Sequence, residues 1–186
     1  MALVASSSTL SPGDRAPEFE LPGTDDQLYT PASFADASAV LIVFTCNHCP
    51  YAEAKLTALN TLATEVEDLA VVGINPNDAT AYPEDSFERM RERVETGEVR
   101  FNAYLRDATQ EVARAYDAVC TPDPFLFRVT DNGLVLALHS RIDDAMGPDA
   151  TPKRFEMREA AEAVIAGDPI PVEATPSRGC SIKWTA

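Results

Sequence analysis

Two short apolar runs mark the first half of the chain. Residues 39–44 (A-V-L-I-V-F) and 69–74 (L-A-V-V-G-I) show no polar alternation, which is typical of strands buried on both faces of a parallel sheet. Between them, apolar residues recur at spacings of three and four, which predicts a helix whose inner face holds Ala52, Leu56, Leu59, Ala63 and Val66. The order strand, helix, strand predicts a right-handed βαβ unit.

Weaker patterns surround this unit. A turn signal at residues 23–26 predicts a hairpin near the start of the chain, between residues 19–21 and 27–29. Further strands are expected at residues 101–105, 125–129 and 134–139, the last two joined by a tight D-N-G turn. Further helices are expected at residues 86–94, 107–116 and 151–166, the last opening at Thr151-Pro152. The Glu/Arg alternation of residues 86–94 is typical of a solvated face.

These elements indicate a single domain. Residues 1–15 are rich in serine and lack a pattern, so we expect a flexible arm there. Residues 16–167 hold every predicted helix and strand. Residues 168–186 contain three prolines and predict an extended tail over the surface.

Composition narrows the class of protein. With 186 residues, 45% hydrophobic and 24% charged, the chain has the make-up of an ordinary globular domain rather than a disordered protein. No apolar run approaches the roughly 18 residues that cross a bilayer. The first nine residues hold no Lys or Arg, which makes a poor secretion signal, so we expect a cytoplasmic protein.

The charge balance excludes polyanionic partners. Fifteen basic residues stand against 30 acidic ones, for a net charge of −15. That field repels nucleic acids and anionic membrane surfaces. The basic residues include only three lysines, and an acidic, lysine-poor surface suits concentrated salt, where mobile ions screen self-repulsion. A salt-adapted source and a merely acidic protein both remain open.

The cysteines indicate redox chemistry. Cys46 and Cys49 form a C-x-x-C between a predicted buried strand and a predicted helix. A helix N-terminus stabilises a thiolate, the form of cysteine that attacks disulfides and peroxides. We expect Cys46, as the more exposed sulfur, to be the nucleophile, and Cys49, one turn into the helix, to resolve the mixed disulfide. His48, between them, is a candidate partner for the thiolate.

A structural zinc site is the alternative use of this pair. It would need a second pair of ligands, and Cys120, Cys180 and His139 supply no second C-x-x-C or H-x₃-H. The redox interpretation is therefore favoured. His139, on a predicted strand, is interpreted as a structural histidine.

Several motifs resemble a known family when their order is considered together. They are A-P-E-F-E-L-P-G, the buried A-V-L-I-V-F, C-N-H-C-P-Y, C-T-P-D-P-F-L-F, S-R-I-D-D and the terminal G-C-S-I-K-W. Over about residues 10–167 the chain resembles the thioredoxin-fold superfamily. Within it, the chain is most similar to the peroxiredoxin-like redoxin branch, which is related to alkyl hydroperoxide reductase and the thiol-specific antioxidant proteins.

The resemblance implies an α/β thioredoxin fold, with a central mixed sheet flanked by helices, an N-terminal β-hairpin and an extended C-terminal tail. It implies that Thr121-Pro122 is a cis-proline motif that faces the cysteines. The Thr121 backbone would then offer strand-like hydrogen bonds to a bound substrate chain. It also implies Cys46 as nucleophile and Cys49 as resolving cysteine.

Departures from the peroxiredoxin pattern favour dithiol–disulfide exchange. Those enzymes have a threonine three residues before the peroxidatic cysteine, where this chain has Cys46, three before Cys49. Their activating arginine has no clear match, and Arg128 and Arg141 are only candidates. The predicted function is a thiol–disulfide oxidoreductase with a Cys46/Cys49 couple. A peroxiredoxin-like thiol peroxidase is the first alternative.

A carrier of Cu(I) or zinc through Cys46, Cys49 and Cys120 is the second alternative. Cys120 has core packing as its other interpretation, and Cys180 is either an additional resolving thiol or part of a tail anchored by Ile182 and Trp184. No organic cofactor is implied. The expected partners are a protein or small-molecule disulfide, or a peroxide, together with an external thiol reductant. The oligomeric state stays open.

Overall fold

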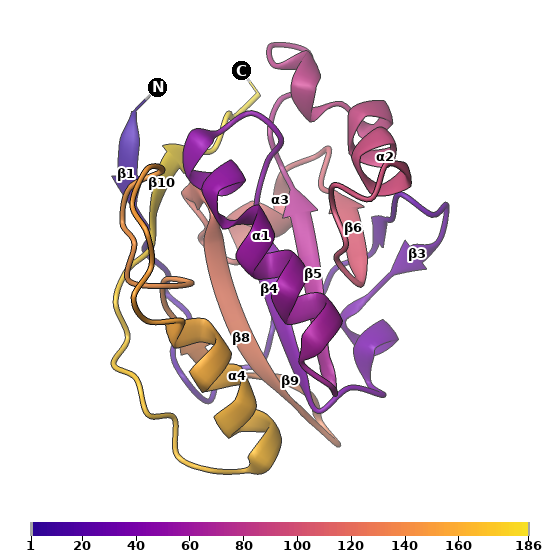
Figure 1. Cartoon of the computed structure of the whole chain (residues 1–186). Coiled ribbons are helices and arrows are strands. Elements are labelled where there is room, and N and C mark those ends of the chain that lie inside the picture. Colours follow the sequence, from indigo (N-terminus) through magenta and orange to yellow (C-terminus); the bar gives the residue numbers. More distant parts are fainter. Residues whose placement is uncertain (1, 186) are drawn as a thin grey trace.

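The computed structural model describes residues 2–185, and a five-stranded mixed sheet forms its centre (Figure 1). The strand order is β6-β5-β4-β8-β9. β4 pairs in parallel with β5, and β5 with β6, whereas β4–β8 and β8–β9 are antiparallel. The mixed sheet and the βαβ unit predicted from the sequence are confirmed. The strands are β4 (Ala39–Phe44), β5 (Leu69–Asn75), β6 (Ala103–Arg106), β8 (Asp123–Thr130) and β9 (Gly133–His139).

Helices cover both faces of the sheet. α1 (Pro50–Glu65) and α4 (Glu156–Ala166) share one core with Leu41 and Val43 of β4. On the opposite face, Val40, Ile42 and Phe44 join a core that includes α3 (Glu111–Ala115). All six residues of β4 are buried, because successive side chains of a strand point to opposite faces and both faces are covered.

Smaller elements flank the sheet. The predicted hairpin is confirmed as β2 (Leu21–Pro22) paired with β3 (Leu28–Tyr29). The D-N-G turn is also confirmed, and Gly133 has the positive φ of +98° that suits glycine. α2 (Phe87–Glu95) follows the short 3-10 helix η2 (Pro83–Asp85), and a second 3-10 helix, η1 (Pro31–Phe34), precedes β4.

Both ends of the chain form a second, three-stranded sheet, in the order β1-β10-β7. β1 (Leu3–Ala5) pairs with β10 (Arg178–Ser181), which also pairs with β7 (Cys120–Thr121). Where the sequence analysis expects a loose arm and a surface tail, the structure therefore has two paired strands. Residues 168–177, before β10, contain no helix or strand. The domain boundaries themselves stay a prediction.

The last helix begins later than predicted. α4 starts at Glu156 rather than at Thr151-Pro152. The Asp144 carboxylate accepts the backbone N–H groups of Lys153 and Arg154, at 2.7 and 3.1 Å, and this holds the intervening segment as a loop. Across residues 2–185, the helices lack the length and apolar character that spanning a membrane requires.

The face of α2 that was expected to be solvated contains one partly buried arginine. Only 12% of the Arg93 side chain is exposed, and its guanidinium pairs with Glu53 and Glu98, each at 2.8 Å. The same guanidinium donates to the Asn47 side chain at 3.1 Å. Arg93 thus fixes the segment between β4 and α1, while Glu88, Arg89 and Glu92 are exposed as expected.

A buried carboxylate joins the loop after β5 to the same segment. The Asp85 side chain, fully buried, accepts the backbone N–H of Asn47 at 2.6 Å and lies 2.6 Å from Nδ1 of His48. It also accepts the side-chain amides of Asn75 at 3.1 Å and Asn77 at 2.8 Å. Each carboxylate oxygen therefore serves two donors.

We expect the Asp85→Asn variant to be destabilised by about 2 to 4 kcal/mol. The NH₂ group that replaces one carboxylate oxygen cannot accept the hydrogen bonds of the donors around it, so those donors lose their acceptor. Urea unfolding at neutral pH measures the change in the free energy of unfolding. Glu84→Gln is the matched control, since Glu84 is exposed and should be nearly neutral. An Asp85→Asn protein as stable as Glu84→Gln would contradict this account of the network.

Candidate active site

The C-N-H-C segment lies between the end of β4 and the start of α1. α1 begins at Pro50, and Cys49 is its N-cap residue. The expectation that Cys49 lies one turn inside the helix is therefore wrong. Proline is favoured in the first turn of a helix because backbone N–H groups there have no partner within the helix, so the lack of one costs nothing. Pro50 therefore starts the helix directly after Cys49. Both sulfur-bearing residues are buried, with 3% of Cys46 and 0% of Cys49 exposed.

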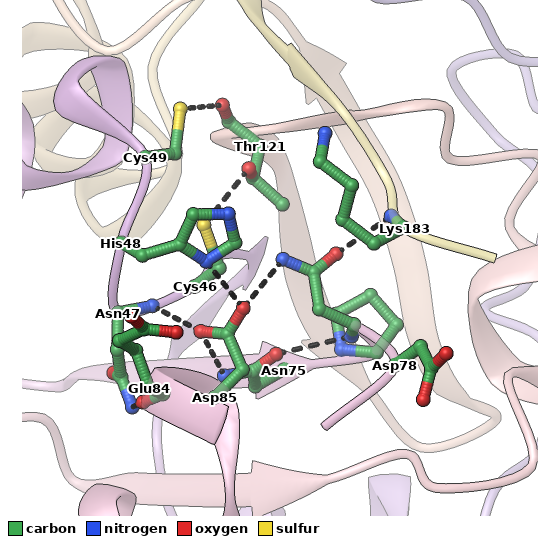
Figure 2. Close-up of polar contacts among 12 residues, drawn as sticks. Cys46, Asn47, His48, Cys49, Asn75, Asp78, Glu84, Asp85, Thr121 and Lys183 are labelled. Atoms are coloured by element: carbon green, nitrogen blue, oxygen red, sulfur yellow. Dashed lines mark hydrogen bonds and ion pairs between the residues drawn. The ribbon is translucent and has the colours of Figure 1, made fainter. Parts of the chain in front are cut away.

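Both thiols contact Thr121 (Figure 2). Sγ of Cys46 lies 3.2 Å from the Thr121 hydroxyl, and the protonated Cys49 thiol donates to the Thr121 carbonyl oxygen across 3.5 Å. The Thr121–Pro122 peptide bond is cis, as the resemblance implies. Two segments that lie more than 70 residues apart in the sequence thus meet at the sulfur atoms.

The hydrogen bonds around the two thiols favour the thiolate at Cys49. The neighbouring Cys46 thiol lowers the pKa of Cys49 to about 4, burial opposes this shift, and Cys180 and the Ala52 backbone N–H lower the pKa further. The hydrogen bond with Cys49 raises the pKa of Cys46, to which burial and the nearby Asp85 charge add. At Cys49 the neighbouring thiols and the N–H groups at the start of α1 thus outweigh burial, so the pair keeps its remaining proton on Cys46.

His48 is held by the buried Asp85. Its ring stacks on Tyr82 with centroids 4.9 Å apart. Figure 2 shows its Nδ1 facing the Asp85 carboxylate. Within the described residues, Nε2 is buried without a hydrogen-bond partner. The sequence analysis singled out His48 but not Asp85, because one carboxylate among 30 acidic residues has no local mark.

Asn47 fixes the backbone between the two cysteines. Its side-chain oxygen accepts the Tyr104 hydroxyl at 2.8 Å, and its amide donates to the Glu84 carbonyl at 2.8 Å. Asn47 and Tyr104 were likewise not predicted from the sequence. The one usable signal pointed to the polar stretch after β5, which contains Asp85. A loop that follows the carboxyl end of a parallel strand lies at the edge of the sheet where such sites form.

Cys120 does not join the other sulfurs in a metal site. Its sulfur points toward the Pro122 carbonyl at 3.8 Å, and burial raises its pKa. Among residues 2–185, the one trio of possible metal ligands within 4.8 Å of one another is Cys46, His48 and Asp85. Because the Asp85 oxygens already serve four donors, a cation there would displace hydrogen bonds. The three-sulfur set of the second alternative is therefore not assembled among the described residues.

Neither candidate arginine contacts a sulfur atom. Arg141 makes a bidentate pair with Glu156, at 2.5 and 2.9 Å. Arg128 pairs with Ala39, at the start of β4, whereas the cysteines follow its far end at Phe44. That separation is roughly 15–20 Å at 3.3 Å per strand residue.

The remaining histidine and the tail residues Ile182 and Trp184 contact residues outside the C-N-H-C segment. Nε2 of His139 lies 2.6 Å from the buried Asp123 carboxylate, and its ring stacks on Phe125 at 4.0 Å. Ile182 is buried, and the Arg114 guanidinium lies over the Trp184 ring at 4.3 Å. Cys180, by contrast, shares a buried cluster with Cys46, Cys49 and Ala52.

Two known structures are similar to this chain over almost its whole length. A hypothetical protein of Sinorhizobium meliloti 1021, SMc02350, is 39% identical, with 98% of each chain covered and a TM-score of 0.84. An uncharacterized conserved protein of Geobacillus kaustophilus is 37% identical, with 100% of this chain and 97% of that chain covered and a TM-score of 0.86. The comparison with curated proteins yields no match.

More distant structures and a family model identify the fold and the family. A secreted disulfide oxidoreductase of Mycobacterium tuberculosis, described as homologous to DsbE of E. coli, is 16% identical. It covers 80% of this chain and 95% of its own, with a TM-score of 0.53, which shows a shared fold. The model of the AhpC/TSA family matches residues 12–137. The chain therefore belongs to the AhpC/TSA family and is a thioredoxin-fold oxidoreductase.

Proposed function

We propose that the chain is a thiol–disulfide oxidoreductase that cycles between a Cys46/Cys49 dithiol and a Cys46–Cys49 disulfide. The Cys49 thiolate attacks one sulfur of a substrate disulfide, and the other substrate sulfur leaves as a thiolate and takes up a proton. Cys46 then loses its proton and attacks Sγ of Cys49, and the second substrate thiol is released. Two electrons pass to the substrate, and an external thiol reductant restores the dithiol.

The contact of both thiols with Thr121 is the observation that supports this proposal most strongly. Both sulfurs contact Thr121, which lies on β7. A substrate chain that pairs with the backbone of β7 would therefore hold its disulfide next to the two cysteines during the exchange. Thr121 and Pro122 are then the substrate-binding residues. His48, positioned by Asp85, is available to exchange a proton with the Cys46 side of the pair.

Cys49 is assigned as the nucleophile, the reverse of the roles expected from the sequence. The helix N-terminus and the neighbouring Cys46 and Cys180 thiols favour a thiolate at Cys49, whereas the interaction with Cys49, burial and the negative charge of Asp85 oppose a thiolate at Cys46. The order of the two cysteines in the sequence does not decide the roles, because the position of the helix start decides which sulfur meets its free N–H groups.

A thiol peroxidase is the second candidate, because an N-cap thiolate at Cys49 also suits attack on a peroxide. That attack would leave a sulfenic acid on Cys49, which Cys46 could close to the same disulfide with loss of water. The contacts of Arg128 and Arg141 favour disulfide exchange, since neither guanidinium reaches the sulfurs to activate a peroxide. A cytoplasmic location and a salt-adapted source stay predictions from the sequence.

The attack on a small disulfide tests the roles of the two cysteines. With dithiobis-nitrobenzoate as substrate, we expect Cys49→Ser to slow release of the first thionitrobenzoate by ~100-fold or more, because the stabilised thiolate is lost. Cys46→Ser should retain that first release within several-fold, and Cys120→Ala is the matched control. Stopped-flow absorbance measures the rate.

The opposite pattern, with the first release lost only in Cys46→Ser, would contradict the assignment of Cys49 as nucleophile. Full activity in both variants would contradict the exchange mechanism as a whole.

The ionisation of Cys49 provides a pH test. Because its pKa of about 4 lies below the ordinary value of 9.0, we expect the reduced protein to gain one thiolate near pH 4 and the rate of attack to be flat around neutrality. An unperturbed thiol would instead gain about tenfold in rate per pH unit below its pKa. Ultraviolet absorbance of the thiolate measures the step, which Cys49→Ser should abolish. A first thiolate that forms only in the alkaline range would contradict the assignment.

A further inference from the structure

The backbone edge of Thr121 is already occupied by the chain itself. β10 runs antiparallel to β7, with Cys180 opposite Thr121 and Ser181 opposite Cys120. It lies at the end of the molecule where α1 begins (Figure 1). The segment that the proposed function assigns to a substrate strand is therefore filled by residues of the C-terminal tail.

The fit between the tail and Thr121-Pro122 is close. A Cβ atom on Gly179 would overlap the Thr121 carbonyl, so only glycine permits this approach. The Ser177 hydroxyl donates to the Pro122 carbonyl at 2.8 Å. Ser177 is itself held by Ser6, whose side chain accepts its N–H at 2.8 Å. The tail is thus anchored on both sides of Gly179.

The pairing of β10 with β7 places a third thiol, that of Cys180, next to Cys46 and Cys49. Cys180 is 5% exposed and lies in the buried cluster with Cys46 and Cys49. Both the thiol and the backbone N–H of Cys180 lower the pKa of Cys49, as their place in this cluster allows. Cys120, the neighbouring thiol on β7, is outside this cluster.

We propose that Cys180 is a third catalytic thiol, presented by a tail strand that occupies the substrate position in cis. The inference rests on the proposed function of the Cys46/Cys49 couple. In the oxidised protein, Cys180 loses its proton and attacks Sγ of Cys49. The Cys180–Cys49 bond forms, the Cys49–Cys46 bond breaks, and Cys46 leaves as a thiolate that takes up a proton. The exchange moves the disulfide to the tail without any added oxidant or reductant.

The redox state of Cys49 controls whether Cys180 can react. In the reduced protein, Cys180 donates to the Cys49 thiolate, and its burial and this bond raise its pKa to about 12. A disulfide at Cys49 removes that negative acceptor, so the thiolate of Cys180 becomes easier to form. The exchange then joins Cys49 to the tail strand and frees the Cys46 thiol, while both sulfurs of the new disulfide stay in the buried cluster.

Disulfide mapping of the Cys46→Ser protein tests the proposal. The reduced protein is treated with one equivalent of diamide, which accepts the two electrons and two protons of the two thiols. We expect a Cys49–Cys180 bridge within one chain, formed at a rate independent of protein concentration. The bridge should persist in Cys46→Ser/Cys120→Ala. It should be replaced by a bridge between two chains in Cys46→Ser/Cys180→Ser.

A bridge from Cys49 to Cys120, or bridges only between chains while Cys180 stays free, would overturn the proposal. The mapping requires no turnover of a substrate. Failure of the exchange mechanism would appear instead in the nitrobenzoate assay, so the two failures are distinguishable.

Displacement of the strand tests the covering role separately. Gly179→Ala should push β10 away from Thr121 and raise the rate of Cys49 alkylation by iodoacetamide about tenfold or more, because a buried thiolate becomes accessible. Gly147→Ala is the matched control, since a Cβ there meets no atom within 4 Å, and its rate should equal that of the wild type. Equal rates in Gly179→Ala and Gly147→Ala would contradict the covering role.

Discussion

Both thiols of the C-N-H-C segment contact Thr121, at 3.2 and 3.5 Å, and this contact determines where the chemistry can occur. The sheet makes it possible, because β4 and β8 are antiparallel neighbours, so that Phe44 at the end of β4 lies opposite Asp123 at the start of β8. The residues after β4 and those before β8 therefore meet at one edge. The start of α1 directly after Cys49 then decides which sulfur receives the field of the helix N-terminus.

A buried polar network holds this edge in place. Asp85 gathers four donors from the C-N-H-C segment and the loop after β5, and Arg93 fixes Asn47 from the side of α2. Buried carboxylates and guanidinium groups are stable only when their hydrogen bonds are satisfied, so the network links the stability of the loop to the geometry of the site. The His48 ring is oriented as part of the same network rather than by the cysteines.

The sequence predicted the elements whose signal is local. The uninterrupted apolar runs of β4 and β5 have few interpretations besides buried parallel strands, and the D-N-G turn carries its own conformational preference. The contacts of Asp85, Arg93 and β10 could not be predicted, because each depends on partners far along the chain. β10 in particular has the sequence R-G-C-S, which shows no apolar alternation, and it is a strand only because it pairs with β1 and β7. The predicted start of α4 was wrong for the same reason, since Asp144 accepts the N–H groups of Lys153 and Arg154 ahead of the helix.

Equilibration of the wild-type protein in glutathione redox buffers, followed by disulfide mapping, tests the central claim most directly. Cys49 contacts both Cys46 and Cys180, so the account predicts that every disulfide formed within the chain includes Cys49 and that Cys120 stays a thiol throughout. A disulfide that omits Cys49, or a fully oxidised buffer that leaves Cys46, Cys49 and Cys180 all free, would contradict a redox cycle centred on this sulfur.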